Sequence, residues 1–143
     1  LETHYYISGD IKNWTVQDSM VFNPSVNVKW GNWGLHRSND DILYSYGLRG
    51  IWKYENNQWQ QMYYLNGEMY GMYSERSDYI LAVSAFNQIF FYNGSSWKLI
   101  SDLFKTNDPY FVFNNVTMVG KEIYVCGYGT ISNKNVTIIW HGK

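Results

Sequence analysis

A stretch near the middle of the chain recurs once, and this repeat limits the folds that the chain can adopt. Residues 42–59 are matched by residues 80–97, 38 positions later. Each stretch carries two isoleucines, a tyrosine and a closing tryptophan at the same spacing: Ile42 and Ile80, Ile51 and Ile89, Tyr54 and Tyr92, Trp59 and Trp97. A period of this length is typical of arrays and propellers, so it predicts architecture more than function.

Within each repeat, short apolar runs are separated by polar turns, which favours strands over helices. Aromatic residues make up 20% of the chain, and aromatic side chains favour half-buried pleated surfaces. Asn93-Gly94 predicts a tight hairpin because both residue types tolerate positive φ. No long apolar pattern has a helical period, so we expect an all-β protein.

The turns divide the chain into about three antiparallel meander units, over roughly residues 21–65, 66–104 and 105–143. In the first unit, Leu48-Arg49-Gly50 is expected to turn the chain between two strands. In the third unit, the corresponding hairpin is longer, through Gly129 to Asn135.

The third unit lacks the tryptophan-bearing strand that closes the second. Its sequence ends soon after Trp140, whereas Trp97 begins the last strand of the second unit. A similar segment surrounds Trp14 near the start of the chain. We expect a strand near residues 11–20, from the same chain or from a second copy, to complete the third unit and cover its edge.

The pattern Ile-aromatic-x-Tyr-Asn-Gly-x-x-Trp resembles the repeats of bacterial β-propeller proteins, whose blades end in a Tyr, Asn/Asp-Gly, Trp hairpin. This resemblance covers the chain from Trp14 onward and implies four-stranded blades. Propellers usually have about 4–8 blades, so three blades imply that two copies close a six-bladed ring, or that the chain is part of a longer protein. The matching residues are Tyr54, Asn56 and Trp59, then Tyr92, Asn93, Gly94 and Trp97, and more loosely Trp140, His141 and Gly142.

The recurring tryptophans predict packing between neighbouring blades, with the indole N–H bonded to backbone; a sugar-stacking platform in each blade is the alternative. Function is therefore sought in what does not repeat, namely residues 30–37, the expected turn at Arg49 and the longer third hairpin. Strand alternation places Trp30 and Trp33 on opposite faces unless a glycine bulge intervenes, so one is expected in the core and the other at a surface. The candidate ligand-binding residues are Trp30, Asn32, Trp33, His36, Arg37 and Arg49.

The sequence contains no pattern that supports catalysis, a metal or a cofactor. The three histidines (His4, His36 and His141) do not have the spacing of metal ligands. Cys126 is the single cysteine and is expected to be an inert buried thiol. Phosphate-binding glycine loops, nucleophile elbows and zinc-protease motifs are missing. We therefore expect a protein that is not an enzyme and has no cofactor.

Charge and hydropathy limit the partners. The formal net charge is −1 without a basic cluster, which disfavours nucleic acid, and no apolar run of about 18 residues predicts a membrane span. The sequence begins at Leu1, which is compatible with a removed leader, and we take an extracytoplasmic or secreted location as the expectation.

These observations together favour a non-catalytic recognition or scaffold module that forms a homodimer and binds a protein or a glycan. The alternatives are a lectin-like propeller, a fragment of a carbohydrate-active enzyme, and a self-assembling ring with a purely structural role.

Overall fold

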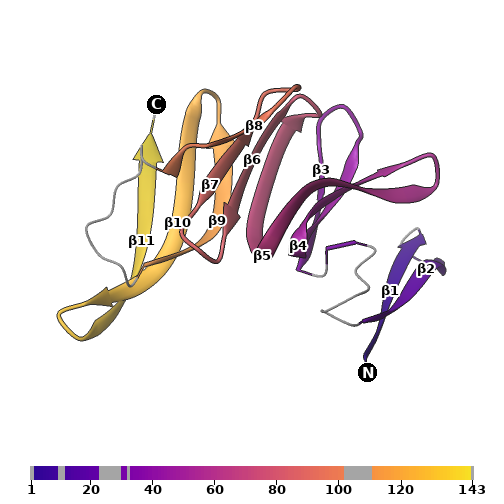
Figure 1. The fold of residues 1–143 in the computed structure, drawn as a ribbon, viewed down its shortest axis with the longest axis horizontal. Helices are drawn as coiled ribbons and strands as arrows, with labels where there is room; N and C mark the ends of the chain where they lie inside the picture. Colours follow the sequence, from indigo (N-terminus) through magenta and orange to yellow (C-terminus); the bar gives the residue numbers. More distant parts are fainter. Residues whose placement is uncertain (1, 10–11, 23–29, 32, 102–110, 143) are drawn as a thin grey trace.

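The computed structural model describes residues 2–9, 12–22, 30–31, 33–101 and 111–142, and none of these residues forms an α-helix. All strand pairs are antiparallel, so the all-β prediction is confirmed (Figure 1). The strands are β1 (Glu2–Gly9), β2 (Trp14–Phe22), β3 (Gly34–Arg37), β4 (Leu43–Glu55), β5 (Gln58–Arg76), β6 (Tyr79–Ser84), β7 (Ile89–Tyr92), β8 (Trp97–Leu99), β9 (Val112–Val119), β10 (Glu122–Ile131) and β11 (Lys134–Gly142).

The strands form three sheets. A central sheet has the order β3-β4-β5-β6-β7-β8, a C-terminal sheet has the order β11-β10-β9, and β1 pairs with β2 alone. The C-terminal sheet lies at one end of the molecule and the β1–β2 hairpin at the other, below the β4–β5 hairpin (Figure 1). The sheets formed by the described strands do not close into a ring within one chain.

The second unit forms the strands that its sequence predicted. Its last three strands are β6, β7 and β8, and the C-terminal half of β5 pairs with β6 as the first. The turn at residues 93–96 is closed by Asn93, whose side-chain Oδ1 accepts hydrogen bonds from the Ser95 and Ser96 amides. These strands confirm a four-stranded meander over this part of the chain.

The first unit differs, because Leu48-Arg49-Gly50 is not a turn. Strand β4 runs through these residues, and the chain reverses at Asn56 and Asn57, where φ is 52° and 60°. The β4–β5 register shifts between Leu48 and Gly50, so the positive φ of Arg49 (73°) belongs to a bulge. Strand β5 likewise continues past residue 65, where we expected the boundary between two units.

The longer hairpin of the third unit is present, and its strands stay paired almost to its tip. Strands β10 and β11 stay paired as far as Ile131 and Lys134, and Ser132 and Asn133 form the turn with positive φ. Ile123 is the counterpart of Ile80; it lies opposite Gly142, whereas Ile80 lies opposite Tyr92. Gly142, and not Trp140, therefore corresponds to Tyr92. The predicted match of Trp140, His141 and Gly142 to the Tyr-Asn-Gly hairpin is therefore wrong by two residues.

The strand pairing also corrects the alignment of the first two units. His36 lies opposite Tyr44, and Tyr73 lies opposite Leu81, and in each pair the second residue is eight positions after the first. The two hairpins therefore have the same length, so these pairs correspond. Tyr44 therefore corresponds to Leu81, a spacing of 37 rather than 38, whereas Ile51 still corresponds to Ile89. The stretch from Tyr44 to Ile51, which lies within β4, is one residue shorter than the stretch from Leu81 to Ile89, and the shared Ile-Leu dipeptide concealed the shift.

Side chains from successive units form three apolar layers. The first lies between the first and second units and includes Tyr44, Ile51, Met69, Met72, Ile80, Ala82 and Phe90. The second lies between the second and third and includes Leu81, Val83, Ile89, Phe113, Val116 and Val125. Strand β6 contributes alternate residues to the two layers, so the middle unit is buried on both faces.

The third layer joins the N-terminal hairpin to the first unit. Met20 and Tyr6 pack with Trp30, Trp52 and Trp59, and the Tyr6 and Trp59 rings meet edge to face with centroids 5.4 Å apart. Strand β2 pairs with β1 and not with β11. Completion of the third unit by the same chain is therefore not formed, and completion by a second copy stays a prediction.

Trp59 and Trp97 pack against these layers, in agreement with the packing that we expected, and the side chain of Trp14 is outside the described part of the structure. Trp97 contacts Tyr63 of the first unit with ring centroids 4.8 Å apart. The expected indole bond to backbone is absent, however. Among the described residues, neither Trp59 Nε1 nor Trp97 Nε1 has a hydrogen-bond partner, although both are buried.

Candidate functional site

The two tryptophans before β3 lie in different environments. Trp30 is 5% exposed and packs in the third apolar layer, so it is a core residue and not part of an exposed ligand surface. Trp33 is 56% exposed, and its amide donates to the Tyr46 carbonyl at 2.9 Å. Asn32, between them, lies outside the described residues.

A close approach to β4 positions Trp33. The Gly31 amide donates to Ser45 Oγ at 3.0 Å, and a Cβ atom at Gly31 would overlap the backbone of Tyr46. Only glycine permits this approach, which directs the chain past β4 and leaves the following indole at the surface.

His36 and Arg37 lie at the other end of β3 and do not join Trp33. His36 Nε2 is 2.9 Å from the Ser74 amide nitrogen and 3.0 Å from the Ser74 carbonyl oxygen, which ties β3 to β5. Arg37 forms an exposed ion pair with Asp41 at 3.1 Å. The predicted site residues that the structure describes therefore do not form one surface.

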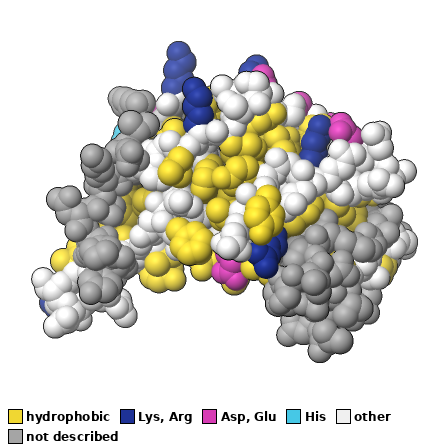
Figure 2. Space-filling view, in the orientation of Figure 1, with side chains coloured by type: hydrophobic (Ala, Val, Ile, Leu, Met, Phe, Trp, Pro, Cys, Tyr) yellow, Lys and Arg dark blue, Asp and Glu magenta, His cyan; other side chains and the backbone are white. Residues whose placement is uncertain are grey.

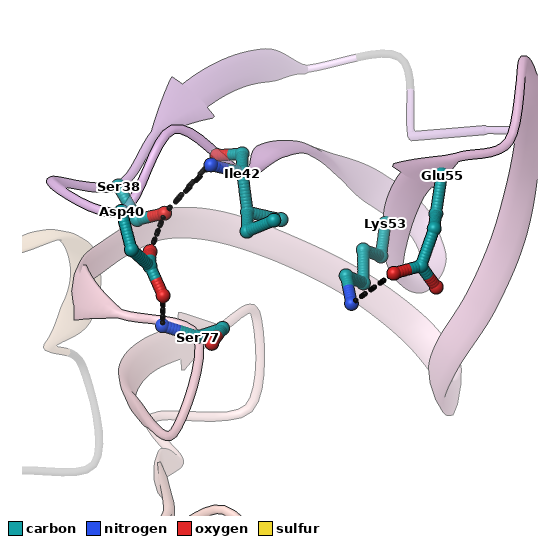
Figure 3. A network of polar contacts seen from close by, with 6 residues as sticks. All are labelled: Ser38, Asp40, Ile42, Lys53, Glu55 and Ser77. Carbon is teal, nitrogen blue, oxygen red and sulfur yellow. Dashed lines mark hydrogen bonds and ion pairs between the residues drawn. The ribbon is translucent and has the colours of Figure 1, made fainter.

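The end of the molecule that holds His36 is built from two linked turns (Figure 3). Asp40 accepts hydrogen bonds from Ser38 Oγ at 2.5 Å and from the Ser77 amide at 2.9 Å. These bonds, from Ser38 first and then Ser77, lower the pKa of Asp40 to about 2. The separate Lys53–Glu55 ion pair lies on β4. Asp40 thus serves to join the β3–β4 turn to the β5–β6 turn.

Arg49 lies on β4 and contacts the partner strand β5. Its Nη1 donates to Asn66 Oδ1 at 2.6 Å and to the Tyr64 hydroxyl at 3.1 Å, and its carbonyl accepts from Gln61 Nε2 at 2.8 Å. Arg49, which the sequence predicted to lie in a turn, therefore makes cross-strand contacts within the sheet.

Trp33 belongs to a group of side chains that we name the aromatic cluster: Trp33, Glu68, Tyr70 and Tyr128. The rings of Trp33 and Tyr70 meet edge to face, with centroids 5.7 Å apart. Burial raises the pKa of Tyr70, and the negative charge and hydrogen bond of Glu68, and then Tyr128, raise it further. The cluster brings together residues from all three units, of which sequence reasoning identified Trp33 alone.

One signal could have identified Tyr70. Under the corrected spacing of 37, Trp33 corresponds to Tyr70 and Gly34 to Gly71, so both units begin their first strand with aromatic-Gly. The spacing of 38 concealed this match. Tyr128, which is 55% exposed, joins the cluster only through the packing of the third unit on the second.

The aromatic cluster offers two exposed ring surfaces, a carboxylate and phenol hydroxyls. Rings of this kind pack against apolar faces of a ligand, while the polar groups bond to its hydroxyl or amide groups. Hydrophobic side chains also reach the surface across the middle of the face shown in Figure 2. No group of three or more potential metal ligands, and no helix long and apolar enough to span a membrane, occurs among the described residues.

No protein-family model matches the chain, and no curated protein is significantly similar to it. The function is therefore argued from the geometry of the aromatic cluster.

Proposed function

We propose that this chain is a non-catalytic recognition module that holds a protein or glycan ligand against the aromatic cluster. The observation that carries the proposal is the exposed indole of Trp33, supported edge to face by Tyr70. The layers between units account for the buried aromatics, whereas an indole with more than half of its surface exposed contributes little to folding stability.

The polar composition of the cluster fits a ligand that is both apolar and hydrogen-bonding. Glu68 supplies acceptor atoms and the tyrosine hydroxyls supply donors. A lectin-like function uses these same groups on a sugar ring. The alternative of a carbohydrate-active enzyme calls for a pair of carboxylates around one bond, and the described cluster contains a single carboxylate, Glu68.

The architecture in this proposal is that of a propeller in which each unit is a blade and two copies close a six-bladed ring. The stacking of the second unit between the first and the third supports it, and so does the meander of β5 to β8. In such a ring, the aromatic cluster of each copy would lie at the same end of the central channel.

Binding to a glycan array by the wild type and Trp33→Ala tests the function. We expect binding that the variant loses by at least tenfold, while Leu99→Ala, which changes a similarly exposed residue, retains it. If the ligand is a protein, a photo-crosslinking amino acid at position 33, but not at position 99, should capture one partner from an extract. Silence in both experiments would contradict the proposal.

A further inference from the structure

In the two layers between units, successive units pack against each other with equivalent faces. The face of the first unit that carries Tyr44 and Ile51 packs against the face of the second that carries Met72, Ile80 and Ala82. The opposite face of the second unit, with Leu81, Val83 and Ile89, packs in the same way on Phe113, Val116 and Val125 of the third. We call the face with Tyr44 and Ile51 in the first unit, and with Leu81 and Val83 in the second, the leading face, and the opposite face of each unit the following face. In both layers, a leading face packs against the following face of the next unit.

The leading face of the third unit has no such neighbour in the described structure. Cys126 pairs with Ile139 in the third unit, and Val83 pairs with Ile89 in the second. Cys126 therefore corresponds to Val83, Ile139 to Ile89, and Tyr124 to Leu81. Ile139 is 67% exposed, whereas Ile89 is 0% exposed. A groove of about 310 Å³ lies here, lined by Asn115, Val116, Thr117, Tyr124, Cys126 and Ile139.

The rim of this groove is polar. The Tyr124 ring stacks on His141 with centroids 4.6 Å apart and planes at 7°. The Tyr124 hydroxyl donates to Glu122 Oε2 at 2.9 Å, and His141 Nε2 lies 3.0 Å from the same oxygen. An apolar centre with a polar rim is the usual composition of a protein–protein interface.

The following face of the first unit is exposed at the other end of the molecule. Leu35 lies opposite Ser45 as Met72 lies opposite Ala82, so Leu35 and Met72 are equivalent. Leu35 is 55% exposed and Met72 is 4% exposed. The β1–β2 hairpin covers Trp52 and Trp59 on this side, which leaves the part of the face near Leu35 open.

We infer that the leading face of the C-terminal sheet binds the following face of the first unit of a second copy, with the groove at Cys126 and Ile139 receiving Leu35 of that copy. The occupant follows from the chain itself, since Met72 and Val116, the counterparts of Leu35, each pack on a leading face. This inference rests on the proposed two-copy ring and assigns its interface.

The strand edges agree with this arrangement. In the described sheets, β11 has one neighbour, β10, and β2 has one neighbour, β1. The equivalent strand β7 pairs on its other edge with β8. With the second copy in place, its β2 lies beside β11 and its β1–β2 hairpin becomes the outer part of the third unit. Two such contacts, related by a two-fold axis, would cover both β11 edges.

A disulfide crosslink tests the contact. Leu35→Cys adds a second thiol to a chain whose single cysteine is Cys126. Within one chain, strands β5 to β7 lie between β3, which holds Leu35, and β10, which holds Cys126 (Figure 1). Under mild oxidation we expect a covalent dimer that reducing agent dissolves. Leu99→Cys, at a similarly exposed position on β8, should crosslink at least tenfold more slowly. Equal rates would overturn the inference.

Light scattering gives an independent readout. We expect the wild type to have twice the mass of one chain, Ile139→Lys to shift it to a monomer, and Phe86→Lys, at an exposed residue elsewhere, to leave it unchanged. Circular dichroism checks that each variant is folded. A dimer that survives Ile139→Lys would overturn this interface but not the ring, and a monomeric wild type would overturn both. Glycan-array binding by the Ile139→Lys variant then tests recognition separately.

Discussion

Asp40 and Ser77 join two turns that are 37 residues apart in the chain. The Ser77 amide donates to Asp40 Oδ2 at 2.9 Å, and the neighbouring Asn39 amide donates to the Glu75 carbonyl at 3.0 Å. The first two units are thus held together at this end by the Asp40 carboxylate and by backbone polar groups, while Glu68 and Tyr70 of the aromatic cluster lie earlier on β5.

Replacing Asp40 should therefore destabilise the protein in a pH-dependent way. The folded pKa, about 2, is below the ordinary value of 3.8, so the ionised carboxylate stabilises the fold above about pH 4, and this contribution disappears as the pH falls through about 2. We expect Asp40→Asn to lower the urea midpoint at pH 6 and to approach the wild type near pH 2. Asp41→Asn, at the exposed ion pair with Arg37, should change the midpoint little at either pH.

The buried phenol of Tyr44 should make the stability of the fold depend on pH in the alkaline range, with stability lost as the pH rises. Burial, followed by the charge of Asp40, raises the pKa of Tyr44 to about 12. The neutral phenol is preferred in the fold, so its contribution to stability is complete below about pH 10 and is lost as the pH rises toward 12. Tyr44→Phe should lose less stability than the wild type between pH 9 and pH 11.5 in urea unfolding. Parallel losses in the two proteins would contradict this assignment.

The middle unit should be the most sensitive to loss of apolar volume because both of its faces are buried. Ile80 is fully buried in the first apolar layer. We expect Ile80→Ala to cost about 2–5 kcal/mol in the free energy of unfolding and Ile80→Val about 0.5–1.5 kcal/mol. Leu99→Ala, at an exposed position, should cost less than about 0.5 kcal/mol. Similar costs for Ile80→Ala and Leu99→Ala would be inconsistent with the layer described.

Gly71 should not tolerate a side chain, because it lies where the second unit meets the third. A Cβ atom there would be 2.6 Å from the Cα atom of Asn115, which is backbone and cannot rotate away. We expect Gly71→Ala to destabilise the protein by about 1–3 kcal/mol. In Gly67→Ala the new methyl would meet the exposed ring of Phe86, which can move, so thermal unfolding should change less.

The sequence by itself determined the all-β class and most strands of the second unit, because turn residues such as Asn93-Gly94 act over a few neighbouring positions. It also placed one of Trp30 and Trp33 in the core and the other at the surface, although both residues precede β3 and so lie outside the strand in which alternation was expected. In the third unit the turn at Ser132 and Asn133 lies inside the longer hairpin expected through Gly129 to Asn135, but the sequence did not show that the strands stay paired as far as Ile131 and Lys134.

Only the tertiary structure decided how the first unit is built and where its site residues lie. Leu48-Arg49-Gly50 is compatible with a turn or with a bulge, and pairing of both Leu48 and Gly50 with the part of β5 that ends at Glu68 selects the bulge. Long-range packing also brings Tyr70 beside Trp33 and Tyr128 close enough to Tyr70 to influence its pKa. Local residue patterns carry no record of these contacts, because they join residues far apart in the chain.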